Sequence, residues 1–355
     1  DYLKCLEARL IDNGMTAPVY LVQSNGGVAT PQMAASQPAR LLLSGPSGGA
    51  KAAETIAHRL DHLNLVAVDM GGTSYDVSLV EGGRVHQVNQ GEVDGCPVRL
   101  PMVEMRTIGA GGGSIAGTDT AGGLYVGPES AGAAPGPACY DRGGKRPTVT
   151  DANVILGRID PHHFLGGAMH LNSEAAKQAI KTDVAKPLQL ELEDTAEGIT
   201  QIAVAHMASA IRLSLFEKGL DPEDFSLISF GGAGGLHACE TAMELDIKQI
   251  IFPCDPGTLS AWGMLYADIT HDLTSAQLMS ADENAKPELA KAVAALSTQG
   301  LNFLNTDGIA NKDRKLTFSL DLRYSGQAYE ISTPFNDTND LEGAVKTFHE
   351  LHQAQ

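Results

Sequence analysis

Short apolar runs alternate with helical stretches along most of the chain. Runs at residues 65–69, 76–80 and 84–88 have the period-two spacing of strands, and glycine-containing turns separate them. These three runs predict an antiparallel meander. Further strands are predicted at 19–22, 227–230, 249–252, 315–324 and 328–332.

Apolar residues spaced three or four apart predict helices between these strands. The strongest pattern covers 194–219, where Gly219 is the stop signal. Its expected stripe comprises Ile199, Ile202, Ala203, His206, Ala210, Leu213 and Phe216. Other helices are predicted at 1–13, 50–60, 151–156, 173–182, 236–245, 258–266, 286–298 and 341–355. Residues 107–146 show little periodicity and predict a glycine-rich loop region, too long to be mere connection.

Length and charge narrow the classes of protein. The 355 residues suffice for two or three compact units. Because 43 acidic side chains face 25 basic ones, the net charge is −18, which disfavours nucleic acid and anionic membrane as partners. No apolar run approaches the roughly 20 residues of a membrane span, so we expect a cytoplasmic protein. The five cysteines are scattered without a CxxC pair and are expected to be buried thiols.

The 39 glycines gather in a few loops. The stretch 45–51 (GPSGGAK) lacks the Gly-Lys pair of a P-loop, and 232–238 misses the dinucleotide fingerprint by one position. The remaining candidate is VDMGGTSYD at 68–76, at the tip of a predicted hairpin. Its glycine amides with Thr73 and Ser74 can hold a phosphate, while Asp69 and Asp76 can hold Mg²⁺ or a water. The alternative is an ordinary tight hairpin turn with solvated aspartates.

Five motifs in order resemble the hydantoinase A/5-oxoprolinase family. They are residues 69–80, 108–116 (IGAGGGSIA), 127–140 (GPESAGAAPGPACY), 147–153 (PTVTDAN) and 230–237 (FGGAGGLH), and the resemblance covers roughly residues 40 to 330. It implies an α/β fold similar to the actin and sugar kinase ATPases, with a ribonuclease-H-like lobe whose mixed sheet is flanked by helices.

The same resemblance implies site residues. Asp69 and Asp76 would be catalytic, with Asp69 also the holder of Mg²⁺. The ATP phosphates would lie on Gly71, Gly72, Thr73 and Ser74, and adenosine on Gly231, Gly232, Gly234 and Gly235. The small-residue helices after Gly48 and at 260–267 would be the two helices that connect the lobes.

Three further features have both a functional and a plainer interpretation. Residues 109–114 form either an anion nest for substrate, built on Gly111, Gly112, Gly113 and Ser114, or a flexible connection. Asp151 is either catalytic or a helix cap. His237 either binds substrate or is a packed, hydrogen-bonded core histidine. His162 and His163 lack a third metal ligand at any usual spacing, and Cys139 lacks a local nucleophile signature, so neither indicates a site.

The resemblance implies ATP-dependent ring opening of a cyclic amide such as hydantoin, N-methylhydantoin or 5-oxoproline, through phosphorylation of the amide oxygen. A hydantoinase B-like second subunit or a homo-oligomer is the expected partner. Two alternatives stay open: a subunit of an ATP-dependent ketone carboxylase, and a nucleotide-sensing module without catalysis.

Two departures from the family pattern affect the expected organisation. No first phosphate loop precedes Gly45, so we expect a fragment whose own catalytic competence is in doubt. Its expected parts are a remnant of the N-terminal lobe with the first connecting helix (1–62), the ATP-binding lobe with a long glycine-rich insertion (63–275) and a truncated C-terminal region (276–355). The second departure is Arg106, which stands where a histidine is expected.

Overall fold

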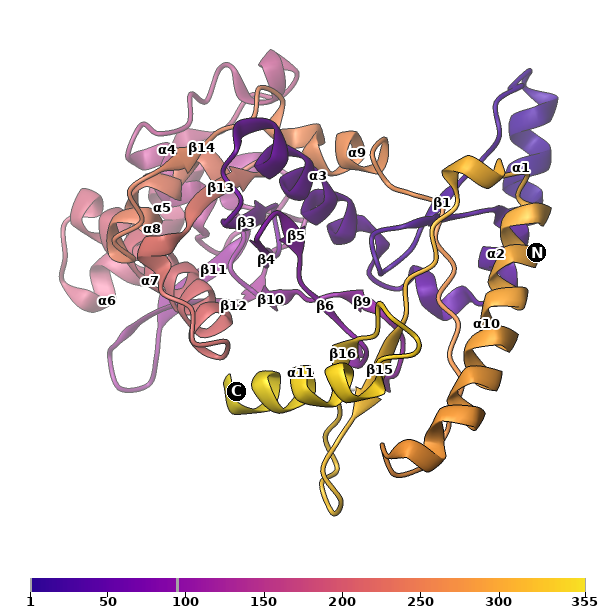
Figure 1. The fold of residues 1–355 in the computed structure, drawn as a ribbon. Helices are drawn as coiled ribbons and strands as arrows, with labels where there is room; N and C mark the ends of the chain where they lie inside the picture. Colours follow the sequence, from indigo (N-terminus) through magenta and orange to yellow (C-terminus); the bar gives the residue numbers. More distant parts are fainter. Residues whose placement is uncertain (1, 94–95, 355) are drawn as a thin grey trace.

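A mixed six-stranded sheet forms the centre of the chain in the computed structural model, which describes residues 2–93 and 96–354 (Figure 1). Its path runs β10-β4-β3-β13-β14, and β5 pairs with β4. The strands are β3 (Leu65–Met70), β4 (Tyr75–Glu81), β5 (Arg84–Val85), β10 (Arg106–Ile108), β13 (Ser226–Phe230) and β14 (Ile250–Ile251). The pairs β3–β4 and β4–β10 are antiparallel, whereas β13 is parallel to both β3 and β14. This order and these directions are those of a ribonuclease-H-like lobe, as the sequence predicted.

Helices cover both faces of the sheet, which explains why β3 and β13 are apolar and buried along most of their length. One face packs on α4 (Val149–Ile155), α7 (Leu192–Phe216) and α8 (Ala238–Glu244). The other face packs on α3 (Ser44–Leu60) and α9 (Leu259–Met264). Side chains of β3 alternate between these two cores, so each helical layer contacts every second residue of the strand.

Small residues bring α3 and α9 into direct contact. A Cβ on Gly263 would lie 2.0 Å from the Gly48 carbonyl oxygen. The glycine-rich stretch expected to precede the first of these helices therefore belongs to its first turns. At the other end of the contact, the Arg59 guanidinium lies 5.0 Å from the ring centres of both Trp262 and Tyr266.

The buried face of helix α7 agrees only in part with the predicted stripe. Its buried side includes Ile199, Ala203, Met207 and Ile211, whereas the expected stripe members His206, Leu213 and Phe216 are exposed. By length and composition alone α7 could cross a membrane, and half of its most apolar stretch is buried inside the protein. Since that half packs on the sheet as a core helix does, the apolarity of α7 is weak support for a membrane span.

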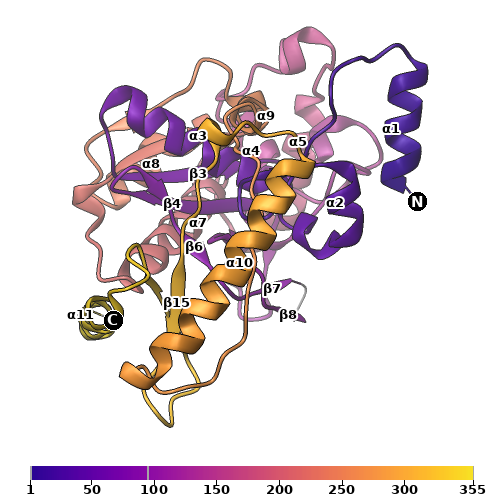
Figure 2. The same cartoon turned by 45° about the vertical axis from the view of Figure 1, so that its right-hand side comes forward.

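The remaining elements lie around this lobe, and parts of both chain ends lie to one side of it (Figures 1 and 2). The helices are α1 (Tyr2–Asp12), α2 (Pro31–Ser36), α5 (Ser173–Ile180), α6 (Lys186–Leu188), α10 (Lys286–Thr306) and α11 (Leu341–Ala354). Among the described residues, five antiparallel pairs lie outside the central sheet. One is the hairpin at residues 114–130, and the others are β1 (Leu21–Val22) with β2 (Val28–Ala29), β6 (Gln87–Val88) with β9 (Met102–Val103), β7 (Gly91–Val93) with β8 (Cys96–Val98), and β15 (Ser319–Leu322) with β16 (Ile331–Pro334).

Three predictions of local structure were wrong. The strand expected at 84–88 is broken between β5 and β6, which pair with different partners. The loop region expected at 107–146 contains an antiparallel hairpin of β11 (Ser114–Thr118) and β12 (Leu124–Ser130). Of the cysteines expected to be buried, only Cys139 is; Cys5, Cys96, Cys239 and Cys254 are exposed.

Candidate active site

Three glycine-rich segments leave the sheet at one edge. The register of β3 and β13 places Phe230 beside Asp69, so the chains that follow both parallel strands emerge together. Strand β10 ends at this edge as well, because Ile108 pairs with Tyr75 at the start of β4. The hairpin tip 71–74, the loop 231–235 and the run 109–114 therefore meet at the carboxyl ends of the strands, where open α/β sheets bind ligands.

The hairpin tip presents unused backbone donors. Only the Gly71 amide bonds within the tip, donating to the Ser74 carbonyl at 3.3 Å. The amides of Gly72, Thr73 and Ser74 donate to no acceptor among the described residues. Gly72 and Thr73 are exposed, and a Cβ on Gly71 or Gly72 would meet nothing within 4 Å. Unbonded amides at an exposed loop tip are the kind of donor that a phosphate needs.

The run 109–114 supports the back of this tip. The Gly112 and Gly113 amides donate to the Gly71 and Gly72 carbonyls at 3.1 and 2.6 Å. A Cβ on Gly111 would lie 2.5 Å from the Thr73 nitrogen, so only glycine permits this approach. The Gly111 amide donates to the Ser114 hydroxyl at 2.9 Å, and the Ser114 amide donates to the Gly111 carbonyl. The amides of Gly111, Gly112, Gly113 and Ser114 are thus bonded within the protein, which favours a supporting role for this run; the expected anion nest stays a prediction.

Helix α4 fixes this arrangement from behind. The backbone amide and the hydroxyl of Thr150 both donate to the Gly112 carbonyl at 2.8 Å. The next residue, Asp151, has no exposed surface and accepts from the Thr148 amide at 2.9 Å and the Cys139 amide at 2.7 Å. It closes the capping box of α4 with Thr148. The enclosed carboxylate with its oxygens occupied favours the helix-cap interpretation of Asp151, and its expected catalytic role stays a prediction.

Asp69 and Asp76 lie opposite each other on β3 and β4. Asp76 accepts from the Thr107 hydroxyl at 2.5 Å and the Ser74 hydroxyl at 3.1 Å. Asp69 accepts from the Ser260 hydroxyl on α9 at 3.2 Å. Burial raises the pKa of Asp69, the Ser260 hydrogen bond opposes this shift, and the neighbouring Asp76 charge adds to it. Asp69 thus lies next to the hairpin tip as a half-buried carboxylate, and one of its two oxygens accepts a hydrogen bond.

The loop 231–235 contacts the hairpin directly. A Cβ on Gly231 would lie 2.3 Å from the Asp69 Oδ1, and the Ala233 amide donates to the Met70 carbonyl at 2.9 Å. Gly232 is exposed with open space around it. Gly234 is buried, where a Cβ would lie 2.8 Å from the Ser229 hydroxyl, and Gly235 is exposed. The two loops that the sequence assigned to phosphate and adenosine therefore share one site.

His237 does not reach this site. It is 1% exposed, and its Nε2 lies 3.2 Å from the side-chain nitrogen of Asn153 on α4. Burial lowers the pKa of His237 to about 4, and the positive charge of Arg158 contributes to that shift. These contacts favour the interpretation as a core histidine, in which a neutral ring joins the start of α8 to α4; the expected substrate contact stays a prediction.

Sequence reasoning missed the partners that hold the site from a distance. Thr150 and Asn153 had no predicted role at the site, although Thr150 bonds to Gly112 and Asn153 contacts His237 at the start of α8. Ser260 reaches Asp69 from 191 positions further along the chain, and no local pattern predicts such a contact.

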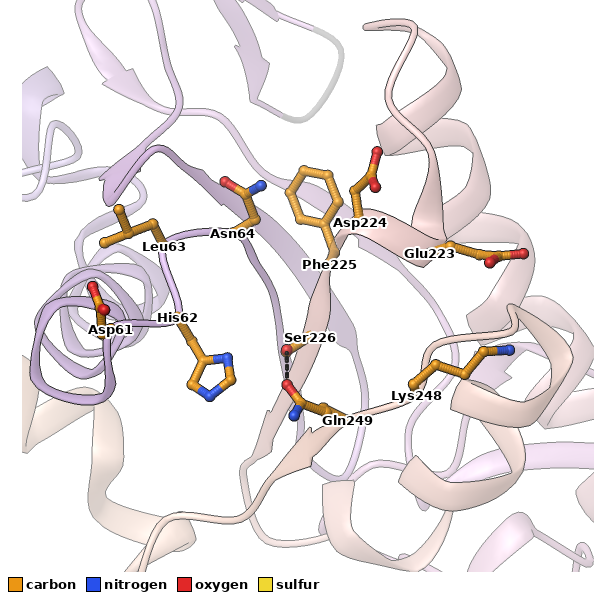
Figure 3. A pocket seen from close by; sticks show the side chains of 10 residues that line it. All are labelled: Asp61, His62, Leu63, Asn64, Glu223, Asp224, Phe225, Ser226, Lys248 and Gln249. Carbon is orange, nitrogen blue, oxygen red and sulfur yellow. Dashed lines mark hydrogen bonds between the residues drawn. The ribbon is translucent and has the colours of Figure 1, made fainter.

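Two surface pockets lie away from the glycine loops. One, of about 400 Å³, lies at the opposite edge of the sheet, where β3, β13 and β14 begin (Figure 3). It is lined by Asp61, His62, Leu63, Asn64, Glu223, Asp224, Phe225, Ser226, Lys248 and Gln249. A second, of about 460 Å³, lies between β4, β10 and the end of α7, where Arg106 pairs with Glu217 and Lys218 with Glu104. Neither includes the glycines of the shared site.

The site fits a nucleotide-bound metal rather than a metal held by protein alone. Over residues 2–93 and 96–354 no group of three or more His, Cys, Asp or Glu side chains is arranged to hold an ion. Mg²⁺ bound together with phosphates needs only one or two carboxylates, because phosphate and water oxygens supply the other ligands. Asp69 and Asp76 can supply that number.

Fold and site together define a ribonuclease-H-like lobe with a phosphate-type hairpin and a second glycine loop at one edge. The family model for hydantoinase/oxoprolinase matches residues 1–273. The chain belongs to this family, and the match begins and ends earlier than the range of about 40 to 330 that the motifs indicated.

Three matches with known proteins each span 99% of the chain. The caprolactamase subunit alpha of Pseudomonas jessenii is 38% identical over 360 residues, which are 99% of this chain and 52% of the relative. The crystal structure of the ATP-dependent caprolactamase from that organism has a TM-score of 0.86 at 37% identity, covering 99% of this chain and 52% of the other. The nucleotide-free structure of acetone carboxylase, an ATP-dependent enzyme, has a TM-score of 0.78 at 26% identity. The match covers 99% of this chain and 51% of that chain. The chain thus spans about half the length of these relatives.

Proposed function

We propose that this chain is the ATP-binding part of an enzyme that opens a cyclic amide at the cost of ATP. The substrate class is that of hydantoin, N-methylhydantoin, 5-oxoproline and simple lactams. The observation that supports the proposal most strongly is the meeting of two loops: the hairpin with unbonded amides at Gly72, Thr73 and Ser74 lies against the Gly231 loop. The similarity to a caprolactamase subunit supports the amide as substrate.

The chemistry requires activation of a poor electrophile. Amide resonance reduces the reactivity of the carbonyl carbon, and transfer of the terminal phosphoryl group from ATP to the amide oxygen activates that carbon for attack by water. The ring C–N bond then breaks as the nitrogen takes up a proton, and the acyl phosphate left behind is hydrolysed by a second water to a carboxylate and phosphate. Mg²⁺, where it is bound with ATP, neutralises phosphate charge and would be held by Asp69 with Asp76 beside it. The amides at the hairpin tip position the phosphate oxygens, and Gly232 and Gly235 leave room for the nucleoside.

The hairpin holds its donors in place without the ligand. Its tip is supported from behind by Gly112 and Gly113, which are in turn fixed by Thr150. Because these donors are held in place before the nucleotide arrives, little ordering is needed when phosphate charge moves during transfer.

A partner subunit belongs to the proposal. The most similar relative described above is called a subunit alpha, which supports a second subunit of hydantoinase B type. We place water attack and product release at the surface shared with that subunit, since this chain spans only about half of its relatives.

The test measures phosphate release from ATP by the full-length protein, with and without the neighbouring subunit. Hydantoin, 5-oxoproline, caprolactam, and acetone with bicarbonate are added in turn. Release stimulated by a cyclic amide and abolished by Asp69→Asn supports the proposal. Release that requires a ketone and bicarbonate identifies a carboxylase subunit instead. ATP binding without turnover on any substrate identifies a nucleotide-sensing module.

A further inference from the structure

Phe252 is a large aromatic side chain left 52% exposed beside the glycine loop. It follows β14 directly, at the edge of the sheet where β13 leads into Gly231. We propose that the Phe252 ring stacks on the base of the bound nucleotide and is a nucleotide-binding residue. This inference rests on the proposed function and assigns the contact that would favour a nucleotide over inorganic phosphates.

The geometry brings the ring to the open part of the loop. A Cβ on Gly235 would lie 3.9 Å from the Phe252 Cε1, so the ring edge lies beside the space that a side chain at position 235 would occupy. Gly235 is itself exposed, and Gly232 has open space around it. One part of the ring therefore lies near the loop backbone while about half of the side chain remains in solvent.

The backbone on both sides of Phe252 is fixed relative to the loop. Before it, Ile251 pairs with Ile228 of β13. After it, the Pro256 carbonyl accepts from the Gly231 amide at 3.0 Å. Pro253 further restricts the backbone of Phe252. An exposed aromatic held this way loses little conformational freedom when a base covers it, and a purine supplies a flat apolar face of suitable size.

Base stacking on an aromatic ring changes affinity by roughly five- to 150-fold per base in other nucleic-acid-binding proteins. We expect a fold-change in affinity in the lower part of this range here, because a base can cover only the exposed side of the Phe252 ring. Phe252→Leu, which keeps an apolar side chain but removes the ring, should weaken ATP binding about tenfold. Phe252→Tyr, which keeps the ring, should stay within about threefold of wild type.

The test measures dissociation constants of the full-length protein for ATP and for inorganic tripolyphosphate, which has the phosphates but no base. Phe216→Leu is the matched control, because Phe216 is 58% exposed at the end of α7 that leads toward the start of β13, whereas the glycine loop follows the end of β13. The inference predicts that Phe252→Leu weakens ATP binding but not tripolyphosphate binding, and that Phe216→Leu changes neither.

Two results overturn the inference while the proposed function stands: unchanged ATP binding in Phe252→Leu, or an equal loss for ATP and tripolyphosphate. The second would mean that Phe252 only packs against the loop or a partner subunit. A wild-type protein that binds tripolyphosphate and ATP equally well also contradicts stacking. A wild-type protein that binds neither contradicts the proposed function itself.

Discussion

Gly231 lies so close to Asp69 that a Cβ at position 231 would come within 2.3 Å of the Asp69 Oδ1. Gly231 also has φ +82°, a backbone conformation that residues with side chains rarely adopt. Glycine is thus required twice at this position, once for the backbone and once for the contact. The contact connects the phosphate-type hairpin to the second glycine loop.

Gly231→Ala should therefore separate the two loops. The added methyl group would also meet the Met70 carbonyl oxygen at 2.5 Å, and this backbone atom cannot rotate away. We expect at least a tenfold loss in ATP affinity, measured by titration calorimetry. Gly45→Ala, in the first turn of α3, is the matched control, because nothing lies within 4 Å of its Cβ position. Equal ATP affinity in Gly231→Ala and wild type would show that the contact is unimportant for binding.

Asp69→Asn should separate catalysis from stability. Loss of the carboxylate removes the ligand for a nucleotide-bound metal, and we expect turnover to fall at least 100-fold. Because burial raises the pKa of Asp69, the charged carboxylate disfavours the fold at neutral pH, and stability from this group increases as pH falls through that pKa. The amide should therefore leave the melting temperature at pH 7 unchanged or raised.

Asp61→Asn, at the opposite edge of the sheet, should change neither turnover nor melting temperature. Activity of wild type should also fall with acidification at a higher pH than for an ordinary aspartate, since protonation abolishes the metal ligand. An Asp69→Asn protein that keeps more than half of wild-type turnover would rule out the assigned role.

Asp151→Ala should act on stability rather than on chemistry. The variant leaves the buried amides of Ala138, Cys139 and Thr148 without their acceptor, which costs about 3–5 kcal/mol of unfolding free energy. Urea denaturation measures this loss, and Asp183→Ala, at an exposed aspartate, is the control. Turnover of the folded protein should change less than tenfold. A thousandfold loss of turnover with unchanged stability would restore the catalytic interpretation.

His237 should make stability depend on pH. Its folded-state pKa of about 4 lies below the ordinary value of 6.5, so the unfolded chain takes up the proton first as pH falls. The stabilisation from the neutral ring is complete above pH 6.5 and is lost toward pH 4. Between pH 7 and 4.5 wild type should lose about 2–3 kcal/mol more unfolding free energy than His237→Gln.

Urea denaturation at both pH values measures that difference, with His162→Gln at an exposed histidine as the control. The same pH dependence in His237→Gln and wild type would contradict the assignment of a buried neutral ring.

The strands and glycine loops were predictable because their signals are local. Alternating apolar residues identify β3 and β4, and the glycines between Met70 and Tyr75 mark the tip of the hairpin. Which amides stay free is not local. The Gly112 and Gly113 amides are used because those residues pack on a hairpin about 40 positions earlier in the chain.

Asp151 shows a second limit of sequence reasoning. A threonine followed three residues later by an acid fits a capping box and a catalytic carboxylate alike, and only burial decides between them. Helix α7 shows a third limit, because Leu213 and Phe216 are apolar like core residues yet are exposed, while Leu215 between them is fully buried.

Hydrogen exchange measured by mass spectrometry, with and without a non-hydrolysable ATP analogue, tests the central claim most directly. The tip amides of Gly72, Thr73 and Ser74 donate to no described residue, so they should exchange quickly without the nucleotide. Saturating analogue should slow exchange in peptides covering 70–76 and 230–236. Unchanged exchange in both peptides, or slowing confined to the hollow around residues 61–64 and 248–249, would contradict a nucleotide site at the hairpin.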